Sequence, residues 1–98
     1  MKLSFSDSAI LDLQNIRDFY LQEGAPEVGE NFIVAIFKHV ETLIVHPDIG
    51  RIVPEFDEQH IRELIHSPFR IVYLRELESI QIIRIWRSER QLHLPDDN

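Results

Sequence analysis

The second half of the chain is rich in arginine, the side chain best suited to binding carboxylates and phosphates. Residues 51–90 contain seven arginines and no lysine, namely Arg51, Arg62, Arg70, Arg75, Arg84, Arg87 and Arg90. A guanidinium group donates two parallel hydrogen bonds to such partners and keeps its charge at every physiological pH. The same stretch holds seven acidic residues, so it is neutral overall. This balance indicates selective ion pairs at an interface, because a nonspecific binder of nucleic acid would carry a basic excess.

Several of these arginines also have a structural interpretation. Three acidic residues of the same half can pair with Arg62 and Arg70 across a sheet: Glu55, Glu63 and Glu76. For Arg62 this interpretation is favoured. For Arg70 a functional role is favoured over a structural one, because it stands in the middle of an apolar run where a charge without a partner is costly. Arg84, Arg87 and Arg90 lie close together in sequence, and the use of arginine rather than lysine favours a contact surface. Trp86, between them, is expected to anchor the end of the chain to the core.

The remaining side chains exclude several kinds of site. The sequence has no cysteine, so it can form no disulfide, thiolate zinc site or cysteine nucleophile. His60 and His66 lack the third ligand and the helical spacing of a zinc site, so no metal and no cofactor are expected. His39 and His46 fall on a predicted helix and are expected to be surface or capping residues. Tyr73 is expected in the core.

The length and composition favour one domain in an intracellular setting. The chain has 98 residues, 44% of them apolar, and a formal net charge of −7. We expect a single domain over residues 1–98, with a flexible tail from about 91 to 98. Neither an uninterrupted hydrophobic region of a signal peptide nor an apolar run of about 18 residues is present, so we expect a cytoplasmic protein with no membrane partner.

Periodicity predicts a strand and two helices in the first half. Residues 2–5 alternate apolar and polar side chains, as a strand does. Over residues 9–24 the apolar side chains recur every three or four positions, which indicates an amphipathic helix with Asp12 on its polar face. A serine at position 6 or 8 can cap this helix. A second helix is predicted over residues 26–46, and the two should form an antiparallel hairpin.

The second half changes to a period of two. This pattern predicts strands at residues 61–65, 69–74 and 80–86, arranged as a three-stranded antiparallel meander. Residues 51–53 can begin another strand, which Pro54 interrupts. If that segment is not counted as a strand, each remaining element runs opposite to the one before it. The N-terminal strand is then expected to run antiparallel to the second and fourth strands, at residues 61–65 and 80–86. The expected fold class is α+β, with both helices on one face of a small curved sheet that has an open edge.

Four segments of the second half, taken in order, resemble the RelE/ParE superfamily of toxins from type II toxin–antitoxin systems. They are Gly50–Glu55, Ile61–Ile65, Pro68–Tyr73 and Ile83–Arg90, the last of which carries the arginine cluster. The predicted first helix and the His46-Pro47 corner fit as well, so the resemblance covers nearly the whole chain. It implies the α+β fold of this superfamily and an antitoxin that wraps the toxin.

The resemblance implies one of two activities. RelE-like members cleave messenger RNA in the ribosomal A site, whereas ParE-like members poison DNA gyrase without established nuclease activity. Arg70 and Arg90 match positions at which RelE-like enzymes carry phosphate-binding arginines. Cleavage without a metal also needs a base and an acid, for which Glu55, His60 and His66 are the candidates. His66 is preferred because an imidazole titrates near neutrality, with an ordinary pKa of about 6.5.

Other residues of the RelE-like pattern are missing. Where those enzymes carry lysines on the second strand, this chain has Ile61, Arg62 and Glu63. Where they carry a C-terminal tyrosine, it has only Pro95, Asp96 and Asp97. The pattern therefore retains arginines suited to phosphate and loses the usual base and acid, which favours the ParE-like branch.

The leading prediction is a ParE-like toxin that inhibits DNA gyrase by protein–protein contact, causes growth inhibition, serves plasmid stabilization and is neutralised by a cognate antitoxin. The expected contact residues for target or antitoxin are Arg62, Arg70, Arg84, Trp86, Arg87 and Arg90. One alternative is a RelE-like, ribosome-dependent mRNA endoribonuclease, which would be an enzyme. The other is a degenerate, non-toxic protein that binds antitoxin as a co-repressor. In each case operator DNA would be reached only through the antitoxin, in a toxin–antitoxin hetero-oligomer.

Overall fold

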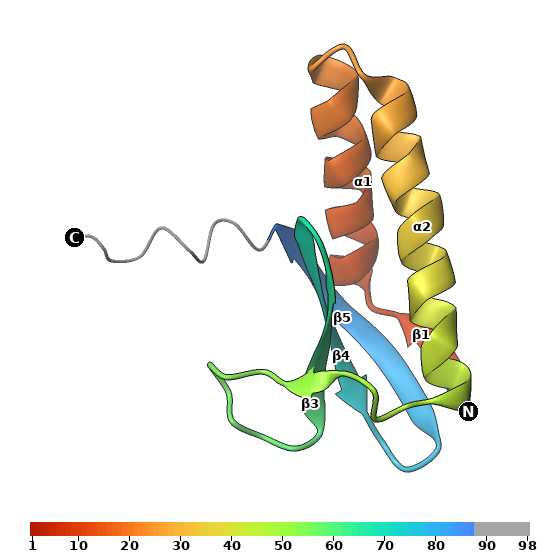
Figure 1. Ribbon diagram of the computed structural model, residues 1–98, viewed down its shortest axis with the longest axis vertical. Helices are drawn as coiled ribbons and strands as arrows, with labels where there is room; N and C mark the ends of the chain where they lie inside the picture. Colours follow the sequence, from red (N-terminus) through yellow and green to blue (C-terminus); the bar gives the residue numbers. More distant parts are fainter. Residues whose placement is uncertain (88–98) are drawn as a thin grey trace, which may run out of the picture.

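The computed structural model describes residues 1–87, which form two helices and a five-stranded sheet (Figure 1). In chain order the elements are β1 (Lys2–Phe5), α1 (Asp7–Gln22), α2 (Pro26–Val45), β2 (Arg51–Ile52), β3 (Ile61–His66), β4 (Phe69–Arg75) and β5 (Ser79–Arg87). This is the α+β arrangement that the periodicity predicts. The expected tail over residues 91–98 lies outside the described residues, as does Arg90.

The predicted direction of the first strand is wrong. The strand order is β1-β5-β4-β3-β2, and β1 runs parallel to β5 rather than antiparallel to it. The error comes from the short segment Arg51–Ile52, which the count of chain reversals left out. It does form a strand, β2, which pairs antiparallel with β3. One added reversal inverts the direction of every later strand relative to β1.

The two helices form an antiparallel hairpin on one side of the sheet (Figure 1). Ser6 caps α1, since its hydroxyl accepts a hydrogen bond from the backbone N–H of Ala9 at 3.1 Å. The same hydroxyl donates to the carbonyl of Ile83 at 3.1 Å, which fixes the start of α1 against β5. Between the helices, Gly24 adopts a φ of 77°, a conformation that glycine accepts without steric cost. Neither helix of the described segment is long and apolar enough to cross a membrane.

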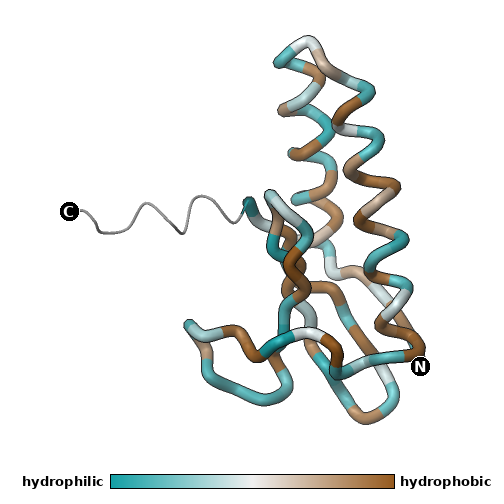
Figure 2. The backbone as a smooth tube through the Cα atoms, in the orientation of Figure 1, coloured by the Kyte–Doolittle hydropathy of each residue, from teal (hydrophilic) through white to brown (hydrophobic). Residues whose placement is uncertain are grey.

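The core lies between the helices and one face of the sheet. On β4, Phe69, Ile71 and Tyr73 point to this side and are fully buried. They meet apolar side chains of both helices, such as Leu13 and Val40. Figure 2 shows hydrophobic stretches along the central strands and at intervals along both helices. The predicted core position of Tyr73 is confirmed.

The opposite face of the sheet is also partly covered. Because side chains alternate along a strand, Arg70 and Val72 point away from the helices, and both are buried. Glu63, which pairs with Val72 in the register of β3 and β4, is fully buried on the same face. The chain between β2 and β3 lies against these residues, since Val53 is fully buried and Glu55 contacts Arg70.

A buried tyrosine fixes the corner between α2 and β2. The Tyr73 hydroxyl accepts a hydrogen bond from the N–H of Gly50 at 3.0 Å and donates one to the carbonyl of Pro47 at 2.9 Å. Burial raises the pKa of this phenol, which keeps it protonated as a donor. Gly50 is required because a Cβ atom there would lie 2.6 Å from the hydroxyl oxygen and 2.7 Å from the carbonyl oxygen of Glu63.

Replacement of Gly50 should therefore destabilise the fold. We expect Gly50→Ala to lower the free energy of unfolding by about 1–3 kcal/mol, because the added methyl group overpacks a rigid corner. Urea denaturation followed by circular dichroism measures this loss. The control is Ile49→Ala at the neighbouring exposed position, which should change stability by no more than about 0.5 kcal/mol. Equal midpoints for Gly50→Ala and the wild type would contradict the proposed role of the close contact.

Candidate functional site

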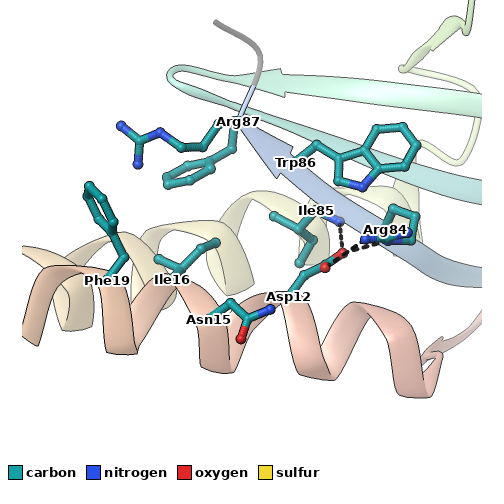
Figure 3. A pocket seen from close by; sticks show the side chains of 9 residues that line it. Asp12, Asn15, Ile16, Phe19, Arg84, Ile85, Trp86 and Arg87 are labelled. Carbon is teal, nitrogen blue, oxygen red and sulfur yellow. Dashed lines mark hydrogen bonds and ion pairs between the residues drawn. The ribbon is translucent and has the colours of Figure 1, made fainter. Parts of the chain in front are cut away.

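A groove lies where helix α1 passes the uncovered part of strand β5. Strand β1 pairs only with Ser79–Ile82, so within residues 1–87 no strand lies beside the edge of β5 beyond this segment. There the Asp12 carboxylate takes the place of a strand. It accepts a hydrogen bond from the backbone N–H of Ile85 at 2.8 Å, and two from the Arg84 guanidinium at 2.8 and 3.0 Å (Figure 3). Asp12 is 8% exposed, although the helical pattern predicted it on the solvent side.

Arginine and aromatic side chains line this groove. The Arg87 guanidinium carbon lies 5.1 Å from the ring centre of Phe19 and 5.4 Å from that of Phe69. The guanidinium carbon of Arg84 lies 5.0 Å from the Trp86 ring centre. We call this feature the α1–β5 groove; its volume is about 540 Å³, and it is lined by Asp12, Asn15, Ile16, Phe19, Phe69, Arg84, Ile85, Trp86 and Arg87.

The Asp12 carboxylate keeps Arg84 charged and oriented. The hydrogen bonds that Arg84 donates to Asp12 raise the pKa of this guanidinium above its ordinary value. Trp86 is half-buried, and Phe19 is 45% exposed although it is a large apolar side chain. Figure 3 shows Phe19 and Arg87 on one side of Ile85, and Arg84 with Trp86 on the other. The α1–β5 groove thus combines aromatic rings with guanidinium groups that lie against them.

A second cluster of charges lies on the sheet face turned away from the helices. The buried Glu63 carboxylate accepts a hydrogen bond from Nε of Arg70 and another from Nε of Arg51, both at 2.6 Å. The terminal nitrogens of Arg70 donate to both oxygens of Glu55, at 3.0 and 2.9 Å. Four groups of alternating charge therefore form a chain across β2, β3 and β4. The Arg70 side chain is only 5% exposed.

This chain changes the interpretation of Arg70. A role toward a binding partner was favoured over pairing within the sheet, because a charge in the middle of an apolar strand is costly without a partner. Glu55 and Glu63 are those compensating charges, and their hydrogen bonds raise the pKa of Arg70. In turn, the hydrogen bonds from Arg70 are the largest cause of the lowered pKa of Glu55. Arg70 therefore holds the sheet together in this geometry, and each of its three nitrogens already donates to a carboxylate.

Arg62 also serves the fold, but not with the expected partners. It donates to the carbonyl of Gly50 at 3.0 Å, and its Nε lies 3.8 Å from the Asp48 carboxylate. It approaches Asp48 instead of the three acidic residues expected as partners, Glu55, Glu63 and Glu76. The reason is that Arg62 faces the corner after α2, whereas Glu63 faces the other side of the strand.

His66, the preferred candidate base, and Arg70, the candidate phosphate-binding arginine, lie on opposite faces of the sheet. His66 pairs in register with Phe69, whose ring faces the helices. Its Nδ1 lies 2.9 Å from Nδ1 of His39, so the expectation that His39 is a plain surface or capping residue is wrong. Burial lowers the pKa of His39, and the neighbouring His66 lowers it further. Arg70 and its partner Glu55 project from the other face.

The remaining proton-transfer candidate is also separate. His60 is exposed and lies 3.2 Å from the carboxylate of Glu58. His46 is exposed at the C-terminal end of α2, as predicted. Arg90 lies outside the described residues. The structure therefore brings Arg84, Trp86 and Arg87 together. Of the groups proposed for RNA cleavage it joins only Arg70 and Glu55, which pair with each other, and it leaves His60 and His66 away from that pair.

Comparison with known proteins identifies the family. A family model described as the ParE toxin of the type II toxin–antitoxin system parDE matches residues 3–92. The chain belongs to the ParE toxin family. A solved structure described as the chromosomal ParDE TA system from P. aeruginosa is 27% identical to it, with a TM-score of 0.75. That match covers 89% of this chain and 95% of the other. No curated protein matches the chain.

Two groove residues of this ParE-family toxin were not recognised from the sequence. Asp12 was placed on the polar face of α1, and Phe19 was not singled out. A signal for Asp12 does exist, because it lies three residues after Ala9 and four before Ile16, both buried, and so borders the buried stripe of the helix. An acidic residue at such a position should have suggested an arginine partner on the sheet.

Loss of Asp12 should destabilise the toxin. In Asp12→Ala the N–H of Ile85 and the guanidinium of Arg84 both lose their acceptor, and we expect the free energy of unfolding to fall by about 2 kcal/mol. Urea denaturation measures this change. The matched control is Asp18→Ala, at an exposed position of the same helix, for which a change within about 0.5 kcal/mol is expected. Similar losses in both variants would show that Asp12 is not a special contact.

The lowered pKa of Glu55 leads to a pH dependence. A carboxyl group whose folded pKa lies below its ordinary value of 4.5 stabilises the fold above that pH, and this stabilisation is lost as the pH falls through the folded pKa. Glu55→Gln should therefore show a smaller fall in urea midpoint than the wild type between neutral pH and pH of about 3. Glu41→Gln, at an exposed position of α2, should follow the wild-type curve. Identical curves for Glu55→Gln and the wild type would contradict the assignment.

Proposed function

We propose that this ParE-family toxin inhibits DNA gyrase by protein–protein contact through the α1–β5 groove, without ribonuclease chemistry. The observation that carries the proposal is the distribution of side chains about the sheet. Arg84, Trp86 and Arg87 converge on one exposed groove, whereas His66 and Arg70 lie on opposite faces. The family assignment supports gyrase as the target, because ParE-like toxins are the gyrase-directed branch of the superfamily.

The groove has the chemistry of a protein-binding surface. Tryptophan, tyrosine and arginine contribute most of the binding energy in protein interfaces, particularly where a pocket excludes water around them. Here Trp86 and Phe19 offer apolar surface, and Arg87 adds a cation supported by neighbouring rings. A partner with an acidic side chain beside an apolar one fits this arrangement.

The chain of charges on the other face argues against RNA cleavage. A phosphate-binding arginine has to present free donors to the substrate, and Arg70 directs its donors to Glu55 and Glu63. An RNA phosphate would have to displace Glu55, a carboxylate that already matches the fork of the guanidinium. The net charge of −7 adds long-range repulsion toward any nucleic acid.

The antitoxin is the second partner that we propose for the groove. The family is that of a type II toxin–antitoxin system, and a toxin of this kind requires a neutralising protein. An acidic, apolar segment of an antitoxin would compete with gyrase for Arg84, Trp86 and Arg87, which gives neutralisation a direct physical basis. Operator DNA would then be contacted by the antitoxin, and growth inhibition and plasmid stabilization would follow from release of the toxin.

A supercoiling assay tests the target. Increasing amounts of the purified toxin should progressively abolish the ATP-dependent supercoiling of relaxed plasmid by DNA gyrase. The same toxin should leave ribosome-bound messenger RNA intact. Full gyrase activity at saturating toxin would overturn the proposal, and cleavage of the message would establish the ribonuclease alternative.

A groove variant tests the contact surface. Trp86→Ala should raise the toxin concentration for half-inhibition by about tenfold or more, the equivalent of about 1.4 kcal/mol at an interface residue. Arg17→Ala is the control, because Arg17 lies on α1 in an exposed ion pair with Glu30 and outside the groove. Its inhibition should stay near the wild-type value. An unchanged Trp86→Ala would place the gyrase contact elsewhere on the toxin.

A further inference from the structure

We propose that the contact between His39 and His66 is a proton-controlled latch, which fastens the hairpin of β3 and β4 to α2 at neutral pH and releases it in mildly acidic conditions. His39 lies on α2, and His66 is the last residue of β3, directly before the turn into β4. Their Nδ1 atoms are 2.9 Å apart, which is the distance of a hydrogen bond. The latch does not rest on the proposed contact with gyrase.

The number of protons on the two imidazoles decides whether this contact can exist. When both rings are neutral, the Nδ1–H of one ring donates to the lone pair on Nδ1 of the other. One added proton preserves the bond, because an imidazolium ring can donate to a neutral ring. After a second proton both Nδ1 atoms carry hydrogen, so neither can accept, and two like charges face each other. The contact is therefore lost in the doubly protonated pair.

The surroundings of His39 on α2 do not compensate a second charge. Burial lowers the pKa of His39 below its ordinary value of 6.5, and the charge of His66 lowers it further. Within residues 1–87 no carboxylate raises it. The charged neighbours on the helix, Lys38 and Glu41, are exposed and lie one and two positions away, so they do not share a face with His39.

The surroundings of His66 on the sheet are also without a compensating carboxylate in the described part of the chain. On the same face of β3 the preceding side chain is Leu64, and the partner in register on β4 is Phe69; both are buried and apolar. Beyond Phe69 in the same row lies Arg87 on β5, a cation, which cannot stabilise a further positive charge. Two protons on the imidazole pair are therefore disfavoured as long as the latch is closed.

Acid weakens the folded state through this pair. In the unfolded chain His39 takes up its proton near the ordinary pKa of 6.5, whereas the folded chain resists protonation there. The stabilisation is therefore complete above pH 6.5 and is lost as the pH falls from this value through the lower pKa of the folded state.

Release of the latch is local, because a second contact keeps α2 on the sheet. Phe32 lies seven residues before His39, about two helical turns, and therefore on the same face of α2. Its ring meets that of Phe69 edge-on, with ring centres 5.2 Å apart, and this contact does not depend on protons. In register, Phe69 lies between His66 and Arg87 and lines the α1–β5 groove. The latch thus supports one wall of the groove in a way that depends on pH.

Urea denaturation of the full-length toxin at about pH 8 and about pH 5 tests the latch, because histidine changes its charge in this range. The range ends above the ordinary glutamate pKa of 4.5, so Glu55 stays charged. From the higher to the lower pH, the urea midpoint should shift further downward in the wild type than in His39→Gln, whose amide can contact His66 but gains no proton. His60→Gln, at an exposed histidine paired with Glu58, should shift like the wild type. Equal shifts in His39→Gln and the wild type would overturn the proposal.

NMR of the ¹⁵N-labelled wild type makes the test independent of variants that fold poorly. At about pH 8, a scalar coupling between Nδ1 of His39 and Nδ1 of His66 should report the hydrogen bond directly. The coupling should vanish as acid is added, and the His39 ring should take up its proton below the ordinary pKa of 6.5. Absence of the coupling at every pH, or its persistence after both rings are protonated, would contradict the latch.

Discussion

The contact between Asp12 and the edge of β5 is the interaction on which the candidate surface depends. Strand β1 ends before β5 does, and an unpaired strand edge presents donors and acceptors that need partners. Asp12 supplies an acceptor from a helix, and with the same carboxylate it fixes the direction of the Arg84 side chain. The groove is therefore a consequence of how the sheet ends: a longer β1 would cover the edge and displace α1 from it.

The arginines that characterise the second half divide into two groups with different roles. Arg51 and Arg70 neutralise Glu63 within the sheet, and Arg75 pairs with Asp48 at the corner after α2. Arg84 and Arg87 instead border the groove, where their guanidinium groups lie over aromatic rings. A count of arginines cannot separate these groups, since both consist of fixed, hydrogen-bonded cations. What separates them is the sheet face or edge from which each side chain projects.

Sequence periodicity was sufficient to predict the helices and the long strands, because their apolar patterns extend over several helical turns or several alternating residue pairs. It also indicated the start of a strand at residues 51–53, but the two-residue strand β2, whose pairing depends on β3, was left out of the count of chain reversals. Periodicity also placed Asp12 on the polar face of α1. At the border of the buried stripe, whether a residue is buried depends on the partner that it contacts, which periodicity does not reveal. The contact of His39 with His66 could not be predicted, since it requires the packing of α2 on the sheet to be known. For Arg70, the missing information was that the chain before β3 folds back to place Glu55 beside it.

The alternating chain of Arg51, Glu63, Arg70 and Glu55 has a consequence for how relatives of this toxin can diverge. Its inner members, Glu63 and Arg70, are almost completely buried, so replacing either one alone leaves the other with a single, partly exposed partner, Arg51 for Glu63 or Glu55 for Arg70, and destabilises the fold. Replacing both with apolar residues of similar volume can be nearly neutral. The two positions should therefore covary: a homologue that lacks the glutamate should also lack the arginine. The outer members, Arg51 and Glu55, are partly exposed and can drift more freely.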